Sequence, residues 1–600
     1  MALPVKKSLA AFAVALVCSV PAIASATLGV YASKTKNQPV SHSTHVALMK
    51  KGSDTVVTVM PDYQGELEPF AWVMVVPEDV SADRVRTLKR EFVSRLDQLS
   101  APRFHEWWEM APCEEGEPVQ DWERSLKASA DTAFLGGMNF GDGKKVAKEL
   151  SLDVDPQEKE GEYTITVLEP DAGVLSWLAE KGYRVPSNAA AELEKHFKSG
   201  KRALVAEVDP NRIELIGGDR AQLSPLRFWT ERPYDALPLR AGLDSGAERE
   251  ELIVYVLDSR ERYEVKNYKN VFPPTNVKVD YVVKERMGEF FNGLYDLMLQ
   301  RDPRAFLNEF AWASTGCGQP CATEPLMIHE LVSLGGDVFE RNVPDEEKNP
   351  EPPPLTDEEK ERHKASLEGK TPKEKRELEK QVEEERETVA ARKALVERHQ
   401  YLVTRLHYRY GKDNLPSDPK FGPAPGPAEG GIGVPKGPEG ELPRDVRASK
   451  ANKLQARYYS LHPSKVVVAC DTPERWRWAK APREVRILRR VWQADDLARK
   501  SRTQIKPAEV IRTPIPSLGL TPVDKDAGAG DAGVDAGAAA ETEPSDCNCR
   551  VPGRALSASS PLSLGALFVL FGWVAARRSA RNRVQSRAVT APSRRAGRGR

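Results

Sequence analysis

The first part of the chain alternates between apolar and polar residues in a way that predicts β-strands. The stretch THVALMKKGSDTVVTVMPDYQG, residues 44–65, alternates on both sides of a Lys-Gly-Ser-Asp turn and predicts a β-hairpin. The run EPFAWVMVVP, residues 68–77, predicts a strand that is buried on both faces. Residues 81–100 instead carry apolar side chains at helical spacing, with Ser81 as the expected N-cap. These side chains are Val85, Leu88, Phe92, Leu96 and Leu99.

Strands and helices interleave through the rest of the body. The pattern predicts strands at residues 162–170 and 250–259, and helices at residues 172–183 and 285–300. Residues 189–210 predict a helix followed by a strand. Because the strand–helix alternation has no strict repeat, the expected fold class is α+β, a mixed α/β arrangement.

Residues 341–400 differ in composition from the segments on either side, and we expect an inserted, charged helical arm. Two capping boxes, Thr356 with Glu359 and Thr371 with Glu374, predict the starts of two helices. The second helix has too few apolar residues to be buried, and they include Leu378, Val382 and Val389. We interpret the arm as a solvated helix with many salt bridges. An interaction arm or a short coiled coil is the alternative.

The remaining body, residues 27–340 and 401–500, is expected to be one domain. Within this domain, residues 421–440 form a loop rich in Pro and Gly. Its GGIG does not follow a strand and open a helix, as a phosphate-binding loop would. Residues 513–546 repeat Asp-Ala-Gly and bury too little apolar surface to fold, so we expect a disordered tether. Its mean span as a flexible coil is about 30 Å.

Both ends of the chain carry targeting signals. Residues 1–26 combine two lysines, a short apolar run and a small-residue site, which predicts a secretory signal peptide cleaved after Ala26. A lipoprotein signal at Cys18 is the rival interpretation. Leu556–Ala576 holds 21 uncharged residues, about 31 Å as a helix, which predicts a transmembrane helix. The arginines after it predict a cytoplasmic tail, so the body is expected outside.

The zero net charge of the whole chain hides a strong separation of charge. Of the 88 basic residues, two lie in residues 1–26 and eleven follow Cys549, which leaves 75 against all 88 acidic residues, a net charge of −13. An acidic body does not attract phosphate, so no nucleic-acid partner is expected.

Four cysteines lie in the expected folded body, and export places them in an oxidising compartment. Cys317 and Cys321 are close enough in sequence to pair with each other, which leaves Cys113 with Cys470, although three pairings are open. The spacing CGQPC has one residue more than thiol oxidoreductases use. We interpret it as a structural disulfide, with redox activity or half of a metal site as alternatives.

Three further stretches have residues suited to chemistry or binding. In TRLHYRY the alternation puts Arg405, His407 and Arg409 on one strand face, either as an anion site or as an exposed polar face. The run beginning at His105, HEWW, is a candidate polysaccharide platform or a core cluster. His329 lacks the second histidine of a zinc-protease helix and is expected at the surface or satisfied in the core.

The stretch PERWRWAKAPREVRILRRVW, residues 473–492, interleaves arginine and tryptophan. It is suited to anionic lipid headgroups or envelope polysaccharide. Pairing with the acidic arm around residues 383–387 is the simpler interpretation, which we favour.

The C-terminal end, residues 547–600, has a cysteine motif, an apolar helix and an arginine cluster in that order. This arrangement resembles the myxobacterial-type C-terminal sorting signal. The resemblance implies cleavage by a membrane-embedded sorting protease and lipid attachment at Cys547 or Cys549, with display at the cell surface. Such signals often have Gly beside the cysteine, whereas Asn548 separates the two cysteines here.

Several segments resemble an uncharacterised bacterial envelope family, domain-of-unknown-function family 2330. They include TVVTVMPDYQGELEPFAWVMVVP, LSPLRFWTERPYDALPLRAGL, FAWASTGCGQPCATEPLMIHEL and YLVTRLHYRYG, and the similarity runs in order from about residue 29 to 480. Two departures are Leu28 in place of a frequent cysteine and the arm, which splits the family core. The resemblance implies no established activity.

Together these patterns predict an exported protein that is held at the outer envelope. We expect a binding or structural module without a cofactor, and an extracytoplasmic thiol-redox enzyme or hydrolase is the alternative. The expected partners are a signal peptidase, the sorting protease, and envelope lipid or polysaccharide.

Overall fold

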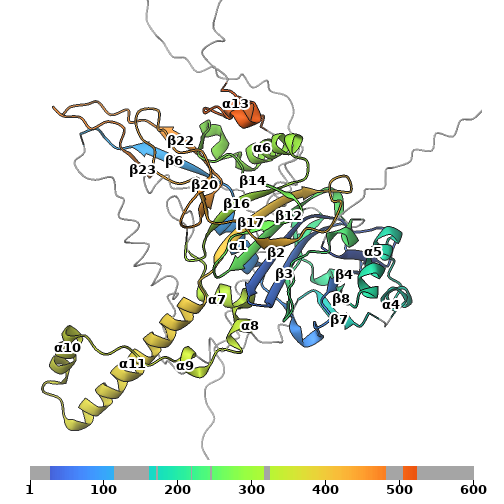
Figure 1. Ribbon diagram of the computed structural model, residues 1–600, viewed down its shortest axis with the longest axis horizontal. Coiled ribbons are helices and arrows are strands. Elements are labelled where there is room, and N and C mark those ends of the chain that lie inside the picture. Colours follow the sequence, from blue (N-terminus) through green and yellow to red (C-terminus); the bar gives the residue numbers. More distant parts are fainter. Residues whose placement is uncertain are drawn as a thin grey trace, which may run out of the picture. The chain divides into compact units, whose positions relative to one another are not determined.

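The computed structural model describes seven ranges of the chain, all within one compact unit. They are residues 28–113, 161–170, 173–217, 219–243, 246–316, 325–480 and 505–522. The fold is a mixed α/β arrangement dominated by strands (Figure 1). No helix in these ranges is long and apolar enough to span a membrane. The transmembrane helix predicted at residues 556–576 lies outside them.

A 13-stranded sheet forms the centre of the body. Its middle contains β2 (Ser41–Lys51) and β3 (Asp54–Gln64), which pair antiparallel with Lys51 opposite Asp54. This confirms the predicted hairpin. Next to β2 lie β12 (Gly246–Asp258), β17 (Leu402–Tyr410) and β16 (Ala305–Ala313), in that order. The shorter strands of this sheet are β5 (Val85–Thr87), β9 (Leu215–Gly217), β10 (Arg220–Gln222), β11 (Leu226–Thr230), β14 (Lys269–Val271), β19 (Ala428–Gly430), β20 (Arg447–Ala448) and β21 (Lys453–Gln455).

A second sheet of four strands covers one face of the first. Its order is β1 (Val30–Ser33), β4 (Phe70–Val76), β8 (Arg202–Val208) and β7 (Tyr163–Leu168). Alternate residues of β4 face opposite ways and all are buried, as the apolar run predicts. Trp72 packs toward the large sheet, with Val57 and Leu252, while Val73 packs against the helices on the outer face. Those helices are α4 (Val174–Glu180) and α5 (Ser187–Lys198).

Helices cover the opposite face of the large sheet. They are α1 (Arg90–Ser100), α6 (Met287–Arg301) and the consecutive turns α7 (Ile328–Leu331), η5 (Val332–Gly336) and α8 (Asp337–Glu340). The helix predicted from Ser81 onward begins later, at Arg90. Ser81 precedes the short 3-10 turn η1 (Ala82–Arg84), and β5 follows because Val85 pairs with Phe228 of β11. Sheet pairing therefore overrides the helical spacing until Arg90.

A third sheet contains β15 (Val277–Lys278), β22 (Arg457–His462), β6 (Arg103–Glu109) and β23 (Trp478–Lys480). The C-terminal described segment, residues 505–522, packs against α6 and this sheet, with Ile511 fully buried and Ile515 and Leu520 nearly so. It includes α13 (Pro507–Val510) and η8 (Pro516–Leu518). Residues 513–522 thus belong to the packed body, which corrects the predicted start of the tether. Residues 523–546 lie outside the described ranges. A two-stranded sheet of β13 (Tyr263–Val265) and β18 (Phe421–Pro423) completes the set.

The segment between β16 and β17 contains both helices predicted for the charged arm, α10 (Asp357–Leu367) and α11 (Pro372–Arg398). A short helix that the sequence analysis does not predict, α9 (Asp345–Lys348), precedes them. The capping boxes at Thr356 and Thr371 are both present, as predicted. Within α11 only Ala390 is buried, so the helix is solvated along most of its length.

Candidate functional site

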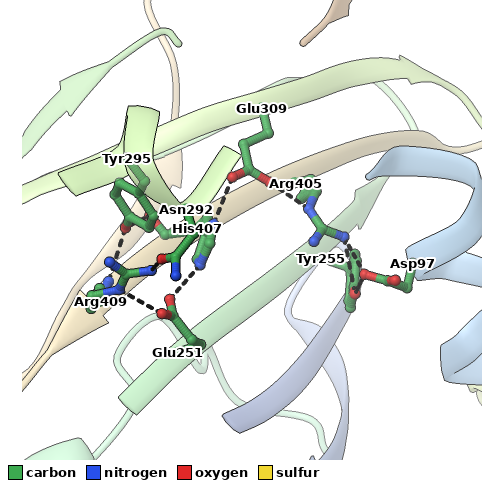
Figure 2. A network of polar contacts seen from close by, with 9 residues as sticks. All are labelled: Asp97, Glu251, Tyr255, Asn292, Tyr295, Glu309, Arg405, His407 and Arg409. Atoms are coloured by element: carbon green, nitrogen blue, oxygen red, sulfur yellow. Dashed lines mark hydrogen bonds and ion pairs between the residues drawn. The ribbon is translucent and has the colours of Figure 1, made fainter. Parts of the chain in front are cut away.

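The residues of β17 that the sequence analysis singled out lie inside the protein. Arg405 and His407 are fully buried and Arg409 is 6% exposed. The interpretation of an exposed polar face is therefore wrong. The alternation itself is confirmed, because Leu406 and Tyr408 join the core between the two sheets while the three basic residues face α1 and α6 (Figure 2). These basic residues bind anions, but the anions are carboxylates of the same chain.

The neighbouring strands bring those carboxylates into place. On β12, Glu251 is opposite Arg409 and Tyr255 is opposite Arg405. On β16, the register shifts between Asn308 and Phe310, so that Glu309 is the additional residue of a β-bulge. A bulge re-aims a side chain and bends its strand, and here Glu309 reaches two residues of β17 at once.

His407 is held between two carboxylates. Its Nδ1 lies 2.6 Å from Glu309 Oε1, and its Nε2 lies 2.7 Å from Glu251 Oε2. Because a carboxylate only accepts hydrogen bonds, both ring nitrogens donate and the ring is an imidazolium. Burial alone lowers the pKa of His407, but the charges of Glu309 and Glu251 outweigh it, and the pKa is raised.

Arg405 connects this pair to α1. Its Nε donates to Glu309 Oε2 at 2.6 Å, and its Nη1 donates to Asp97 Oδ1 at 2.5 Å. The hydroxyl of Tyr255 donates to the same Asp97 oxygen at 2.8 Å, and His45 Nδ1 lies 2.8 Å from that hydroxyl. Burial first, and the charge of Arg405 second, lower the pKa of His45 to about 3, so His45 is neutral.

Arg409 connects the network to α6. Its Nε donates to Glu251 Oε1 at 2.5 Å, and its two Nη atoms donate to Asp296 and Asn292. The hydroxyl of Tyr295 accepts a hydrogen bond of 2.9 Å from the backbone N–H of Arg409. Burial acts to raise the pKa of Glu251, but Arg409 and His407 outweigh it and the pKa is lowered. The carboxylate is therefore ionised.

The network is almost wholly buried and has one more negative than positive charge. Three cations face four carboxylates, of which only Asp296 is substantially exposed, at 35%. Such a group is costly to desolvate but strongly favours one arrangement once it is complete. Its geometry ties α1 and α6 to three adjacent strands, and its burial excludes a substrate from His407. The arrangement is suited to holding the fold.

A second buried polar group lies on the other face of β12. Glu250 accepts hydrogen bonds from Thr44 at 2.6 Å and from Ser41 at 3.2 Å. Burial raises the pKa of Glu250 well above its usual range. Asp62 lies nearby and is paired with Arg220, so Glu250 is held as a neutral acid beside an ion pair.

Of the predicted cysteine sites, one pair lies in the described ranges. Cys113 and Cys470 form a disulfide with Cα atoms 5.6 Å apart, which is the pairing expected by elimination. Cys317, Cys321, Cys547, Cys549 and the cleavage site at Ala26 lie outside the described residues. In the part of the chain that is described, no cluster of three or more His, Cys, Asp or Glu has the geometry of a metal site.

The HEWW run belongs to the core, as one of its two interpretations expected. His105, Glu106 and Trp107 of β6 are 4%, 3% and 1% exposed. Trp108 is partly exposed and stacks on His462 with ring centroids 4.2 Å apart. Glu106 binds Lys284 at 2.7 Å. The buried residues of this run therefore cannot form a platform for polysaccharide.

The two remaining candidates are His329 and the basic stretch at residues 473–492. His329 is exposed, in agreement with the expected surface position. In the basic stretch, Arg475 pairs with Glu109 at 2.7 Å and Arg477 with Glu474 at 2.9 Å. Arg386 of the arm pairs with its neighbour Glu383. For these residues the expected pairing between basic stretch and arm is wrong, because each finds a closer carboxylate; residues 481–492 lie outside the described ranges.

Sequence reasoning missed the carboxylates of the network. Glu309 is the one acidic residue of the apolar strand β16, and Asp97 lies on the buried side of α1, whereas Glu251 follows Glu250 at the start of the apolar run of β12. Glu309 and Asp97 interrupt apolar patterns, and a charged residue in such a position is rarely buried without a partner. That signal marks them as buried charges, but the choice of partner needs the strand order.

A family model described as an uncharacterised protein conserved in bacteria (DUF2330) matches residues 21–421. Among solved structures, one similarity is to the crystal structure of baculovirus P35. It has 9% identity, covers 38% of this chain and 67% of that chain, and has a TM-score of 0.17, which supports no inference. The comparison with curated proteins gave no match.

Proposed function

Because the chain belongs to the uncharacterised bacterial DUF2330 family, we propose a function that rests on its location and its build. The protein is an exported, envelope-anchored surface protein that acts as a binding or structural module. Its body works outside the cytoplasm, and its C-terminal segment attaches it to the envelope after processing at Cys547 or Cys549.

The observation that carries this proposal is the disulfide between Cys113 and Cys470. It joins residues 357 positions apart in sequence, and Cys113 is exposed. Disulfides of this kind persist in oxidising compartments and are rare in the cytosol. The bridge therefore favours an extracytoplasmic body, in agreement with the signal peptide predicted at residues 1–26.

The buried network favours a module rather than an enzyme. An acid–base catalyst needs its titrating group within hydrogen-bond reach of a substrate. His407 has both ring nitrogens occupied by Glu309 and Glu251 and is fully buried. The most strongly organised charged group of the described body thus serves its internal structure.

Intact mass spectrometry of the mature protein from its native cells tests the proposal. We expect a chain that begins at Thr27, ends at Cys547 or Cys549, and carries the added mass of a lipid. A variant with both cysteines replaced by serine is expected to keep its tail and to lack the lipid. Recovery of the wild-type chain with residues 550–600 present and both sulfurs unmodified would contradict the proposal.

A further inference from the structure

Three consecutive valines are exposed in the segment that connects β22 to β23. Val466, Val467 and Val468 are 59%, 85% and 41% exposed. The connecting residues 463–477 form no helix or strand. Burying a valine side chain is favourable by about 1.5 kcal/mol or more, so three exposed neighbours in one loop indicate a contact surface. We name residues 463–470 the valine tip.

The valine tip is fixed to the body at both ends. The backbone N–H of Ser464 donates to Glu109 Oε2 at 2.9 Å, and the disulfide ties Cys470 to Cys113. Beyond it, the backbone N–H of Glu474 donates to the carbonyl of Pro112 at 2.8 Å. The valines are therefore presented by an anchored loop.

Further exposed apolar side chains lie beside the same strand. Tyr281 and Val282 of η4 (Tyr281–Lys284) are 47% and 45% exposed. The ring of Tyr281 packs edge-on against His462, the last residue of β22, with centroids 5.2 Å apart. Lys465 in the tip is exposed as well. Valine, tyrosine and lysine together match a lipid–water interface, where apolar groups enter and the polar ends stay wet.

The point at which the chain leaves the body is close to this sheet. Ile511 forms a β-bridge with Val279, and the backbone N–H of Val279 donates to the carbonyl of Tyr459 on β22. From Tyr459 to Val467 an extended chain covers about 26 Å. From Pro522 to Cys547 or Cys549, the predicted flexible tether would have a mean span of about 30 Å. The lipid proposed on that cysteine can therefore hold the body close enough to the membrane for the valine tip to reach it.

We propose that the valine tip docks on the lipid surface of the membrane that holds the C-terminal segment. This inference rests on the proposed envelope anchoring and adds a second contact to it. The tether alone leaves the orientation of the body free, whereas the tip and the tether together fix the face turned to the membrane. The arginines of the basic stretch do not supply this contact in the described part, because Arg475 and Arg477 are paired within the body.

Hydrogen exchange of the mature protein, purified from its native cells and placed in vesicles of phosphatidylcholine and phosphatidylglycerol, tests the inference. We expect the peptide covering residues 463–469 to exchange about tenfold more slowly in the wild type than in Val467→Asp, after correction for intrinsic rates. Val467 is the most exposed of the three valines, so its replacement leaves the fold intact. The matched control is Val389→Asp on α11, where Val389 is 55% exposed; it is expected to keep the wild-type protection.

Vesicle flotation of the same samples separates this inference from the proposed function. Protein that floats with the vesicles, but whose tip exchanges as fast as in Val467→Asp, overturns the docking and leaves the anchoring intact. Protein that does not float overturns the anchoring and the docking with it. Protection that disappears when the protein is diluted over more lipid assigns the valines to a contact between copies of the chain, and this also overturns the inference.

Discussion

Replacing Glu309 with glutamine tests whether the buried ionic network holds the fold. The substitution keeps the shape of the side chain and removes its charge, so no cavity contributes. Glu309 accepts two charge-assisted hydrogen bonds of 2.6 Å, from Arg405 and from His407. Each is worth about 1.5–3 kcal/mol, and removal of one partner from a buried ion pair costs about 3–5 kcal/mol. We therefore expect Glu309→Gln to lower the free energy of unfolding by about 3–5 kcal/mol.

Urea unfolding at neutral pH, followed by tryptophan fluorescence with the disulfide intact, measures this loss. Glu384→Gln on α11 is the matched control, since the Glu384 side chain is 62% exposed and forms an ion pair with the exposed Lys380 at 3.4 Å. The control is expected to unfold as the wild type does. The double variant Glu309→Gln/His407→Gln is expected to lose less than the sum of the single losses, because both remove the same bond. A midpoint for Glu309→Gln equal to that of Glu384→Gln would refute a structural role for the network.

Three further predictions concern pH, backbone geometry and the disulfide. Because the pKa of His407 is raised in the folded state, its protonation stabilises the fold fully below about pH 6.5, and this stabilisation is lost as pH rises through the folded-state pKa. Urea unfolding midpoints of the wild type should therefore fall from about pH 6 to 9 relative to those of His407→Gln. Midpoints of the two proteins that change in parallel with pH would contradict a protonated His407. Gly431 and Gly437 have the same left-handed φ, 67° and 66°, but a Cβ at Gly431 would lie 1.9 Å from the carbonyl oxygen of Gln455, whereas Gly437 faces open space. Thermal melting should thus show Gly431→Ala destabilised by about 2–4 kcal/mol and Gly437→Ala by about 1 kcal/mol, and equal losses would count against the packing. Replacing Cys113 and Cys470 with serine should cost about 2–5 kcal/mol, measured by thermal melting against the oxidised wild type, and an unchanged melting temperature would count against a stabilising bridge.

The sequence predicts elements well where a single pattern decides them. The hairpin of β2 and β3, the apolar strand β4 and the two capping boxes of the arm follow from local residues alone. The start of α1 does not, because Val85 is drawn into a strand by β11, more than a hundred residues away in sequence. Local spacing has no access to such a pairing.

The partners of the basic residues in the network cannot be predicted from local sequence either. Alternation places Arg405, His407 and Arg409 on one face, but it does not say whether that face meets water or carboxylates. The answer depends on strand order, which places β12 and β16 on either side of β17. It also depends on the bulge at Glu309, a shift of one residue in register that no periodicity of the strand reveals.

The route of the chain between β16 and β17 has a practical consequence. These strands are antiparallel neighbours, yet α10 and α11 lie between them in the sequence and extend away from the sheet before the chain returns at β17 (Figure 1). The loop between the two helices contains Gly369, whose surroundings are open space. Because the entropic cost of closing a long loop rises slowly with its length, a few more residues in this segment should cost little stability. A reporter peptide inserted at Gly369 would therefore allow this protein to be located in living cells without disturbing its buried ionic network.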